Sequence, residues 1–193
     1  MGQLTYQLPS LVEYNRQGWQ MTCSSAAIVT SLLAAVATGL LSAINDIVND
    51  GDFKQTANPH VLDFLYVASF GAITLNASAT VTSLFLIDEL GDLPTLASDL
   101  DKPKEGSLAS DIDILVYYGL GNTWTWTRWH WIISLVLGVW CLFLQVIVLV
   151  YVTQTTPVKV ITTLATAFAV LPMYRLVPSL FKKNNISRKH PCA

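Results

Sequence analysis

Residues 61–90 constrain the fold of this chain more than any other stretch. Their central part, residues 64–87, contains no Asp, Glu, Lys or Arg, and the nearest charges are Asp63 before it and Asp88 and Glu89 after it. An α-helix rises ~1.5 Å per residue, so about 20 residues cross a hydrocarbon layer of ~30 Å. The stretch therefore predicts a helix that crosses a membrane.

Small and polar residues follow one face of this predicted helix. They recur at steps of three and four residues, which places them on the same side: Ser69, Ala72, Asn76, Ala79 and Ser83. Bulky residues lie largely on other faces: Phe70, Ile73, Leu84 and Phe85. In lipid, helices associate through close packing and interhelical hydrogen bonds. The small face therefore predicts a partner helix, with Asn76 as a candidate packing or pathway residue.

Composition places the whole chain in the same class. Of 193 residues, 52% are hydrophobic and 12% are charged, whereas about a quarter of a typical soluble domain is charged. Apolar segments predict four spans, at about residues 23–44, 64–87, 132–151 and 159–181. We expect an all-α, integral membrane four-helix (tetraspan) bundle that forms one domain over residues 1–193.

Two further spans carry packing stripes. The first has small residues at strict spacings of four: Ala27, Ser31, Ala35, Gly39 and Ala43. Such a ridge permits close backbone approach, either within one protomer or between two copies. The third span carries a mildly polar stripe: Ser134, Gly138, Cys141 and Gln145. We expect this stripe to face protein, with Gln145 as a second packing or pathway candidate.

The segments outside the spans differ in character. Residues 91–113 form an acidic loop, and residues 182–193 form a basic tail. The run 114–120 is apolar but too short to cross, and is expected in the interface or packed beneath the helices. Four tryptophans precede the third span and predict an interfacial aromatic belt: Trp124, Trp126, Trp129 and Trp131.

Lysine and arginine predict the orientation. With four spans, one side receives Arg16, Lys102, Lys104, Arg128, Lys182, Lys183, Arg188 and Lys189, and the other receives Lys54 and Lys159. Cytosolic loops carry the excess of positive residues. Both termini and the acidic loop are therefore predicted to be cytosolic.

Residues suited to chemistry are few and scattered. The cysteines include no C-x-x-C pair: Cys23, Cys141 and Cys192. His60 and His130 are assigned to opposite ends of neighbouring spans, so they cannot share one haem iron. We expect neither a metal nor a cofactor, and a net charge of -2 argues against nucleic-acid binding. Arg175 lies within the fourth span, where it either extends into the headgroups or pairs with Asp88 or Glu89.

The segments 76–94 (NASATVTSLFLIDELGDLP) and 124–131 (WTWTRWHW) resemble a group of small multi-pass membrane proteins from mushroom-forming fungi. The resemblance covers the second and third spans. It implies a multi-pass membrane fold and supplies no activity, ligand or site.

Three functions fit these observations. The leading interpretation is a non-catalytic membrane protein that organises the bilayer or assists a partner, which is a second copy or another membrane protein. A small transporter or channel subunit is the first alternative, with Asn76, Gln145 and Arg175 along its pathway. A membrane-embedded enzyme acting on a lipid-like substrate through Asp88 and Glu89 is the second, although no catalytic set can be named.

Overall fold

Four long helices make up the computed structural model in the residues that it describes, which are 10–49, 59–98, 115, 120 and 122–187. They are α1 (Ser10–Asn49), α3 (Pro59–Ser98), α5 (Asn122–Thr153) and α6 (Thr156–Ser187). Side chains are described for residues 10–49, 59–95, 115, 120 and 123–171. The described part of the chain contains no strand, and the expected all-α, four-helix fold is confirmed.

Three of these helices are long and apolar enough to cross a membrane: α1, α3 and α5. The described side chains of α6 give a shorter apolar helix, Thr156–Leu171. A helix of 40 residues, the length of α1 and of α3, extends ~60 Å and exceeds a ~30 Å hydrocarbon layer. The helices therefore continue well beyond the apolar segments that the sequence marks as spans.

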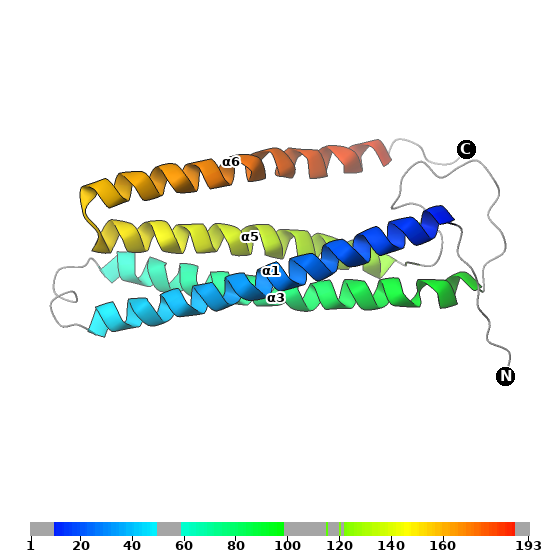
Figure 1. Ribbon diagram of the computed structural model, residues 1–193, viewed down its shortest axis with the longest axis horizontal. Coiled ribbons are helices and arrows are strands. Elements are labelled where there is room, and N and C mark those ends of the chain that lie inside the picture. Colours follow the sequence, from blue (N-terminus) through cyan, green and yellow to red (C-terminus); the bar gives the residue numbers. More distant parts are fainter. Residues whose placement is uncertain (1–9, 50–58, 99–114, 116–119, 121, 188–193) are drawn as a thin grey trace.

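The centre of the bundle is α3, which packs along both α1 and α5. Consecutive helices run antiparallel, so the starts of α1 and α5 and the ends of α3 and α6 lie at one end of the bundle (Figure 1). This pairing of ends matches the predicted topology, and the assignment of that end to the cytosol stays a prediction. We call it the α5-start end below.

A repeat of seven residues explains why three helices pack side by side. The buried positions are Cys23, Thr30, Ala37 and Ile44 on α1, Ser69, Asn76, Ser83 and Leu90 on α3, and Trp124, Trp131, Gly138 and Gln145 on α5. A second buried series on α3 has the same period: Leu65, Ala72, Ala79, Leu86 and Leu93. A period of 3.5 residues keeps one stripe facing its partner along a supercoiled helix pair. The small face predicted for α3 is therefore the one that its neighbours cover.

The small-residue ridge predicted on α1 has a different position. Ala27 is buried, whereas Ser31, Ala35, Gly39 and Ala43 are exposed. A Cβ added at Gly39 would have no neighbouring atom within 4 Å. Packing within one protomer thus uses the seven-residue stripe of α1, and most of the ridge faces outward.

The end of α3 shortens the predicted acidic loop. The helix continues through Pro94 to Ser98, because Leu90 and Leu93 extend its buried stripes. Leu115 and Leu120, from the short apolar run, are buried in the same cluster as Leu90 and Leu93. These two residues of the run therefore pack against the helices, which was one of the two positions expected for it. Residues 99–114, which hold most of the acidic loop, lie outside the described residues.

The last helix, α6, packs against α5 on the side away from α1 and α3 (Figure 1). A short link after Thr153 joins the two helices, and Pro157 takes an early position in α6, where its missing N–H is tolerated. Only Thr166 of its described side chains is buried, and Phe168 is 78% exposed. The described half of α6 is thus a peripheral helix whose apolar surface is free of the bundle core.

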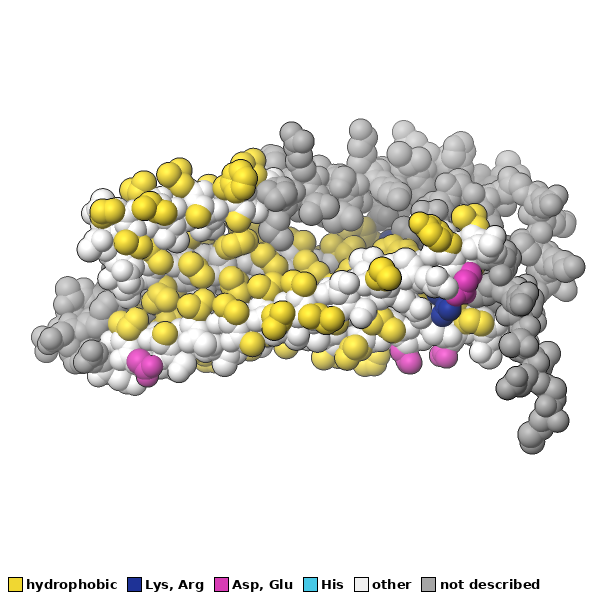
Figure 2. Space-filling model, viewed as in Figure 1, with side chains coloured by type: hydrophobic (Ala, Val, Ile, Leu, Met, Phe, Trp, Pro, Cys, Tyr) yellow, Lys and Arg dark blue, Asp and Glu magenta, His cyan; other side chains and the backbone are white. Residues whose placement is uncertain are grey.

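The outer surface is apolar in the middle of the bundle. Figure 2 shows hydrophobic side chains along the helices on this face, with acidic and basic side chains nearer the two ends. Exposed apolar residues come from every helix and include Leu32, Val36, Val67, Phe70, Leu84, Leu137 and Leu164. A soluble protein rarely exposes an apolar surface this extensive. The surface fits a lipid bilayer.

Candidate functional site

The predicted residue Asn76 lies in a close contact between α3 and α5. It is fully buried, and its side-chain Nδ2 donates a 2.7 Å hydrogen bond to the Ala72 carbonyl oxygen. A Cβ added at Gly138 would lie 2.9 Å from Asn76 Nδ2 and 3.1 Å from the Asn76 backbone nitrogen. Only a glycine at position 138 lets the two backbones approach this closely. The helices are therefore closed against each other at Asn76.

Hydrogen bonds between side chains extend this contact along the bundle. The Trp131 indole Nε1 donates to Ser83 Oγ at 2.7 Å, which joins α5 to α3. The hydroxyls of Thr30 and Thr80 are 2.7 Å apart and join α1 to α3. We call the buried polar contacts from Trp131 to Gln145, centred on Asn76, the polar seam.

Gln145 completes the seam by joining α5 to α1. It is fully buried, and its Nε2 donates to the Ala37 carbonyl oxygen at 3.2 Å. The stripe predicted on the third span therefore faces protein, because Ser134, Gly138 and Gln145 are buried and Cys141 is half-buried. Two acceptors in the seam, Asn76 Oδ1 and Gln145 Oε1, have no hydrogen-bond partner within the residues that the structure describes.

The carboxylates proposed as candidates lie at the α5-start end, near the end of α3. Asp88 is exposed and Glu89 is half-buried, and the buried Oε2 atom of Glu89 has no hydrogen-bond partner in the described part of the chain. The side chain of Arg175, their proposed partner, lies outside the described residues. Neither carboxylate is joined to another side chain by a described ion pair.

The predicted tryptophan belt divides into two kinds of residue. Trp126 is 75% exposed and Trp129 is half-buried, as interfacial residues would be. Trp124 and Trp131 are buried and belong to the core cluster. The division arises because Trp124 and Trp131 are seven residues apart on the inward stripe of α5. Two of the four predicted belt residues therefore pack the bundle.

The sequence did not single out Arg128, which is only 7% exposed. Among the described residues its Nε atom has no hydrogen-bond partner, and no described ion pair includes it. Arg16, by contrast, donates to both carboxylate oxygens of Glu13, at 2.7 and 2.9 Å. This bond precedes the apolar segment of α1 and holds the pKa of Glu13 below its usual value. Arg128 lies four residues after Trp124 and three before Trp131, so it shares a helix face with both. This spacing was the sequence signal that Arg128 faces inward.

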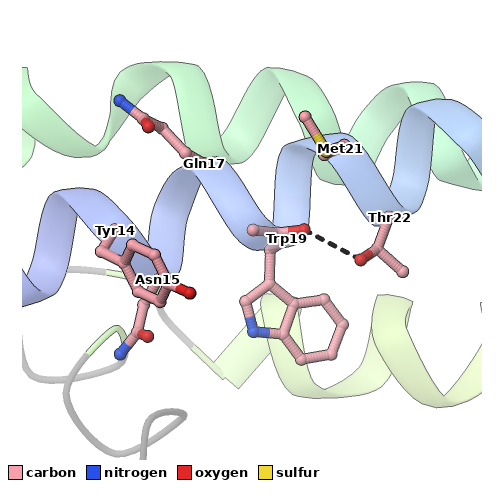
Figure 3. A pocket seen from close by; sticks show the side chains of 7 residues that line it. Tyr14, Asn15, Gln17, Trp19, Met21 and Thr22 are labelled. Carbon is pink, nitrogen blue, oxygen red and sulfur yellow. Dashed lines mark hydrogen bonds between the residues drawn. The ribbon is translucent and has the colours of Figure 1, made fainter.

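A hollow of about 490 Å³ lies beside α1 at the same end of the bundle. Its lining residues all belong to α1: Tyr14, Asn15, Gln17, Gly18, Trp19, Met21 and Thr22. Figure 3 shows Asn15 and Trp19 pointing to the same side of α1, with Thr22 Oγ1 donating to the Gly18 carbonyl oxygen at 2.8 Å. Trp19 also contacts Trp124 edge to face, with ring centroids 6.0 Å apart.

His60 and His130 lie apart, as expected. His60 is near the start of α3 and His130 near the start of α5, at opposite ends of two antiparallel helices. His130 Nε2 lies 3.1 Å from Ser78 Oγ. Among the described residues, no group of three or more His, Cys, Asp or Glu side chains could hold a metal ion.

No protein-family model matches the chain, and comparisons with curated proteins and with solved structures found no similar protein.

Proposed function

We propose that the chain is a non-catalytic, multi-pass membrane protein that organises the bilayer through lateral association with a second copy or another membrane protein. The observation that carries the proposal is the closure of the polar seam. Asn76, a fully buried polar residue that could serve a pathway or a reaction, packs so closely against Gly138 that a Cβ added there would lie 2.9 Å from Asn76 Nδ2. The Asn76 side chain therefore serves to pack α3 against α5.

The surface that suits lateral association is the outward part of the α1 ridge, defined as Ser31, Ala35, Gly39 and Ala43. These side chains are small and exposed, and the space around Gly39 is open. Small residues four apart permit a second helix to approach closely in lipid. The four-crossing arrangement, with both termini in the cytosol, belongs to the same proposal, and α6 supplies the fourth crossing.

Ala35→Leu tests the association directly. The added bulk should leave the protomer folded, because the site faces outward, and should reduce self-association or partner capture at least about fivefold, as expected for losing about 1 kcal/mol of packing. The matched control is Ala77→Leu, which adds the same bulk to an exposed position of α3. Single-molecule bleaching or energy transfer between labelled copies in vesicles measures association, and affinity capture from native membranes measures partner binding. Equal association by both variants and the unchanged protein would contradict the role of the ridge.

A transport function is the second candidate, favoured by one specific observation. Asn76 Oδ1 and Gln145 Oε1 are unpaired acceptors inside the bundle, and unpaired carbonyl oxygens can coordinate cations or accept hydrogen bonds from a permeating solute. The close contact at Gly138 weighs against a path at that level.

Reconstitution distinguishes the two functions. We expect vesicles containing the protein to pass monovalent cations and protons no faster than protein-free vesicles. Flux that Asn76→Leu abolishes in a folded protein would favour the transport function and contradict the scaffold.

A further inference from the structure

The face of α1 opposite its buried stripe carries two more series of residues with a seven-residue period. The first series is Leu11, Gly18, Ser25, Leu32 and Gly39. The second comes three residues later in each repeat: Tyr14, Met21, Ile28, Ala35 and Ser42. All ten residues are exposed, and each is apolar, aromatic or small. We call them the outer stripe.

The period of the outer stripe suits a helix as its neighbour. Apolar residues at alternating steps of three and four keep two supercoiled helices in contact over many turns. A surface that faces lipid needs only to be apolar and requires no such repeat. No charged residue occupies the stripe from Leu11 to Ser42, and Asp46, the next position of the first series, ends it. The pattern therefore indicates that a second helix runs along α1.

The outer stripe continues beyond the part of α1 that lipid covers. The apolar segment begins at about residue 23, so at ~1.5 Å per residue Tyr14 lies about 14 Å and Leu11 about 18 Å before it. The headgroup layer on one side of a bilayer is only about 5–8 Å thick. The Trp19 ring contacts Trp124, which also precedes the apolar segment of its helix. Leu11 and Tyr14 are nevertheless 57% and 75% exposed, so lipid does not account for this end of the stripe.

The hollow beside α1 has the form of a contact between coiled helices. Its lining includes Tyr14, Gln17, Gly18 and Met21, whose spacing of i, i+3, i+4 and i+7 forms the hole that receives one side chain of a facing helix. A Cβ added at Gly18 would meet no atom within 4 Å. Figure 3 shows Gln17 and Met21 on one side of α1 and Trp19 on the other, with Gly18 between them in sequence. The hollow thus leaves room for a close approach at Gly18.

We propose that the outer stripe pairs with the outer stripe of a second copy, in a parallel coiled coil whose two-fold axis is normal to the membrane. The inference rests on the proposed lateral association and names its partner. Two copies inserted with the same topology place their stripes at the same depth and over the same length. Charge does not oppose the pairing, because Glu13 and Arg16 form an ion pair within α1. Arg16 lies seven residues before Cys23, on the side of the buried stripe.

Disulfide cross-linking of the full chain in vesicles tests the contact. Tyr14→Cys and Met21→Cys place thiols on the outer stripe, and Gln20→Cys places one on a half-buried position of α1 outside it. A Cys192→Ser background removes the thiol of the tail. On mild oxidation, we expect disulfide-linked dimers at positions 14 and 21 and at least about fivefold fewer at position 20, because a disulfide requires Cβ atoms ~4 Å apart. Equal cross-linking at the three positions would show random collision and overturn the proposal.

Charge variants test the stripe without added thiols. Tyr14→Glu brings two like charges together across the two-fold axis and should weaken self-association about tenfold or more, measured by energy transfer between labelled copies in vesicles. Trp126→Glu makes the matched change on α5, at another 75% exposed aromatic residue of the same end. That variant and Tyr14→Phe, which keeps the ring, should change self-association less than about twofold. Equal effects of Tyr14→Glu and Trp126→Glu would overturn the proposal.

The same measurements separate this inference from the proposed function. Self-association that Ala35→Leu weakens and Tyr14→Glu leaves unchanged would overturn the coiled coil and retain lateral association through the α1 ridge. An unchanged protein that does not self-associate would also overturn the coiled coil, and partner capture would then decide the proposed function. Failure of both self-association and partner capture would contradict both.

Discussion

The small face of α3 and the small ridge of α1 have similar composition and opposite surroundings. On α3, Ser69, Ala72, Asn76, Ala79 and Ser83 are all buried between α1 and α5. On α1, Ser31, Ala35, Gly39 and Ala43 are all exposed. Small residues therefore do not identify a contact face within this bundle by themselves.

Residue spacing explains the difference. On α3 the small residues alternate steps of three and four, which averages 3.5 and follows a helix neighbour over many turns. On α1 every step is four, and at about 100° per residue each step turns the stripe by about 40° around the helix. The α1 ridge therefore starts at the bundle, at Ala27, and moves away from it. The buried stripe of α1 has the seven-residue period instead, from Cys23 to Ile44.

Replacing each of two glycines by alanine should give the largest difference in stability between the two faces. Gly138→Ala places a Cβ 2.9 Å from Asn76 Nδ2 and 3.1 Å from its backbone nitrogen, and should destabilise the protein by about 1–3 kcal/mol. Gly39→Ala meets nothing within 4 Å and should leave stability unchanged or raise it by up to about 1 kcal/mol. Unfolding in mixed micelles of increasing denaturing detergent measures both, and equal effects at the two sites would contradict the assignment of faces.

Coupling between Gly138 and Asn76 sharpens the comparison. Asn76→Ala removes the side chain that Gly138 packs against and should cost about 1–2 kcal/mol through the lost hydrogen bond and packing. In the Gly138→Ala, Asn76→Ala double variant, the new methyl group fills part of the vacated space. We expect the double variant to be more stable than the sum of the single effects predicts, by at least about 0.5 kcal/mol. Simple additivity would show that the two residues do not touch.

The smallest expected effect concerns one hydrogen bond of the seam. Trp131→Phe removes the indole donor to Ser83 Oγ, a 2.7 Å bond, and should cost about 0.5–1.5 kcal/mol in the same unfolding measurement. Trp126→Phe, at an exposed tryptophan of the same segment, should cost less than about 0.5 kcal/mol. A larger loss for Trp126→Phe than for Trp131→Phe would reverse the division of the tryptophans into core and interface.

The sequence predicted the all-α fold and the covered faces of α3 and α5 because both depend on local properties, whereas Trp131, which it assigned to the belt, is buried. Long segments without charged residues indicate the helices. The alternating steps of three and four residues around Asn76 indicate which side of α3 is covered. Gln145 was predicted to face protein for the same reason, and it does. The inward position of Arg128 was missed because a charged residue beside tryptophans is typical of an interface, whereas the structure leaves it only 7% exposed.

The exposure of the α1 ridge was also not predicted, although its spacing of four residues is consistent with it. A strict spacing of four suits a close, short helix crossing, whether inside one protomer or between two. Which of the two crossings forms depends on how far each stripe of small residues stays aligned with a neighbouring helix along the 40 residues of α1. The structure resolves it through the seven-residue stripe, in which Thr30 contacts Thr80 and Ala37 accepts a hydrogen bond from Gln145.

A single cross-link tests most directly whether the α3 face packs against α5 within one chain. A Cβ built at Gly71 lies 3.9 Å from Cys141 Cβ and 3.3 Å from its Sγ, within the range that a disulfide requires. On mild oxidation in the membrane, we expect Gly71→Cys to form an intramolecular disulfide with Cys141, seen by mass spectrometry, and to lose it in the Cys141→Ser background. Failure of that disulfide to form, or formation of only intermolecular disulfides, would contradict the packing of α3 against α5 described above.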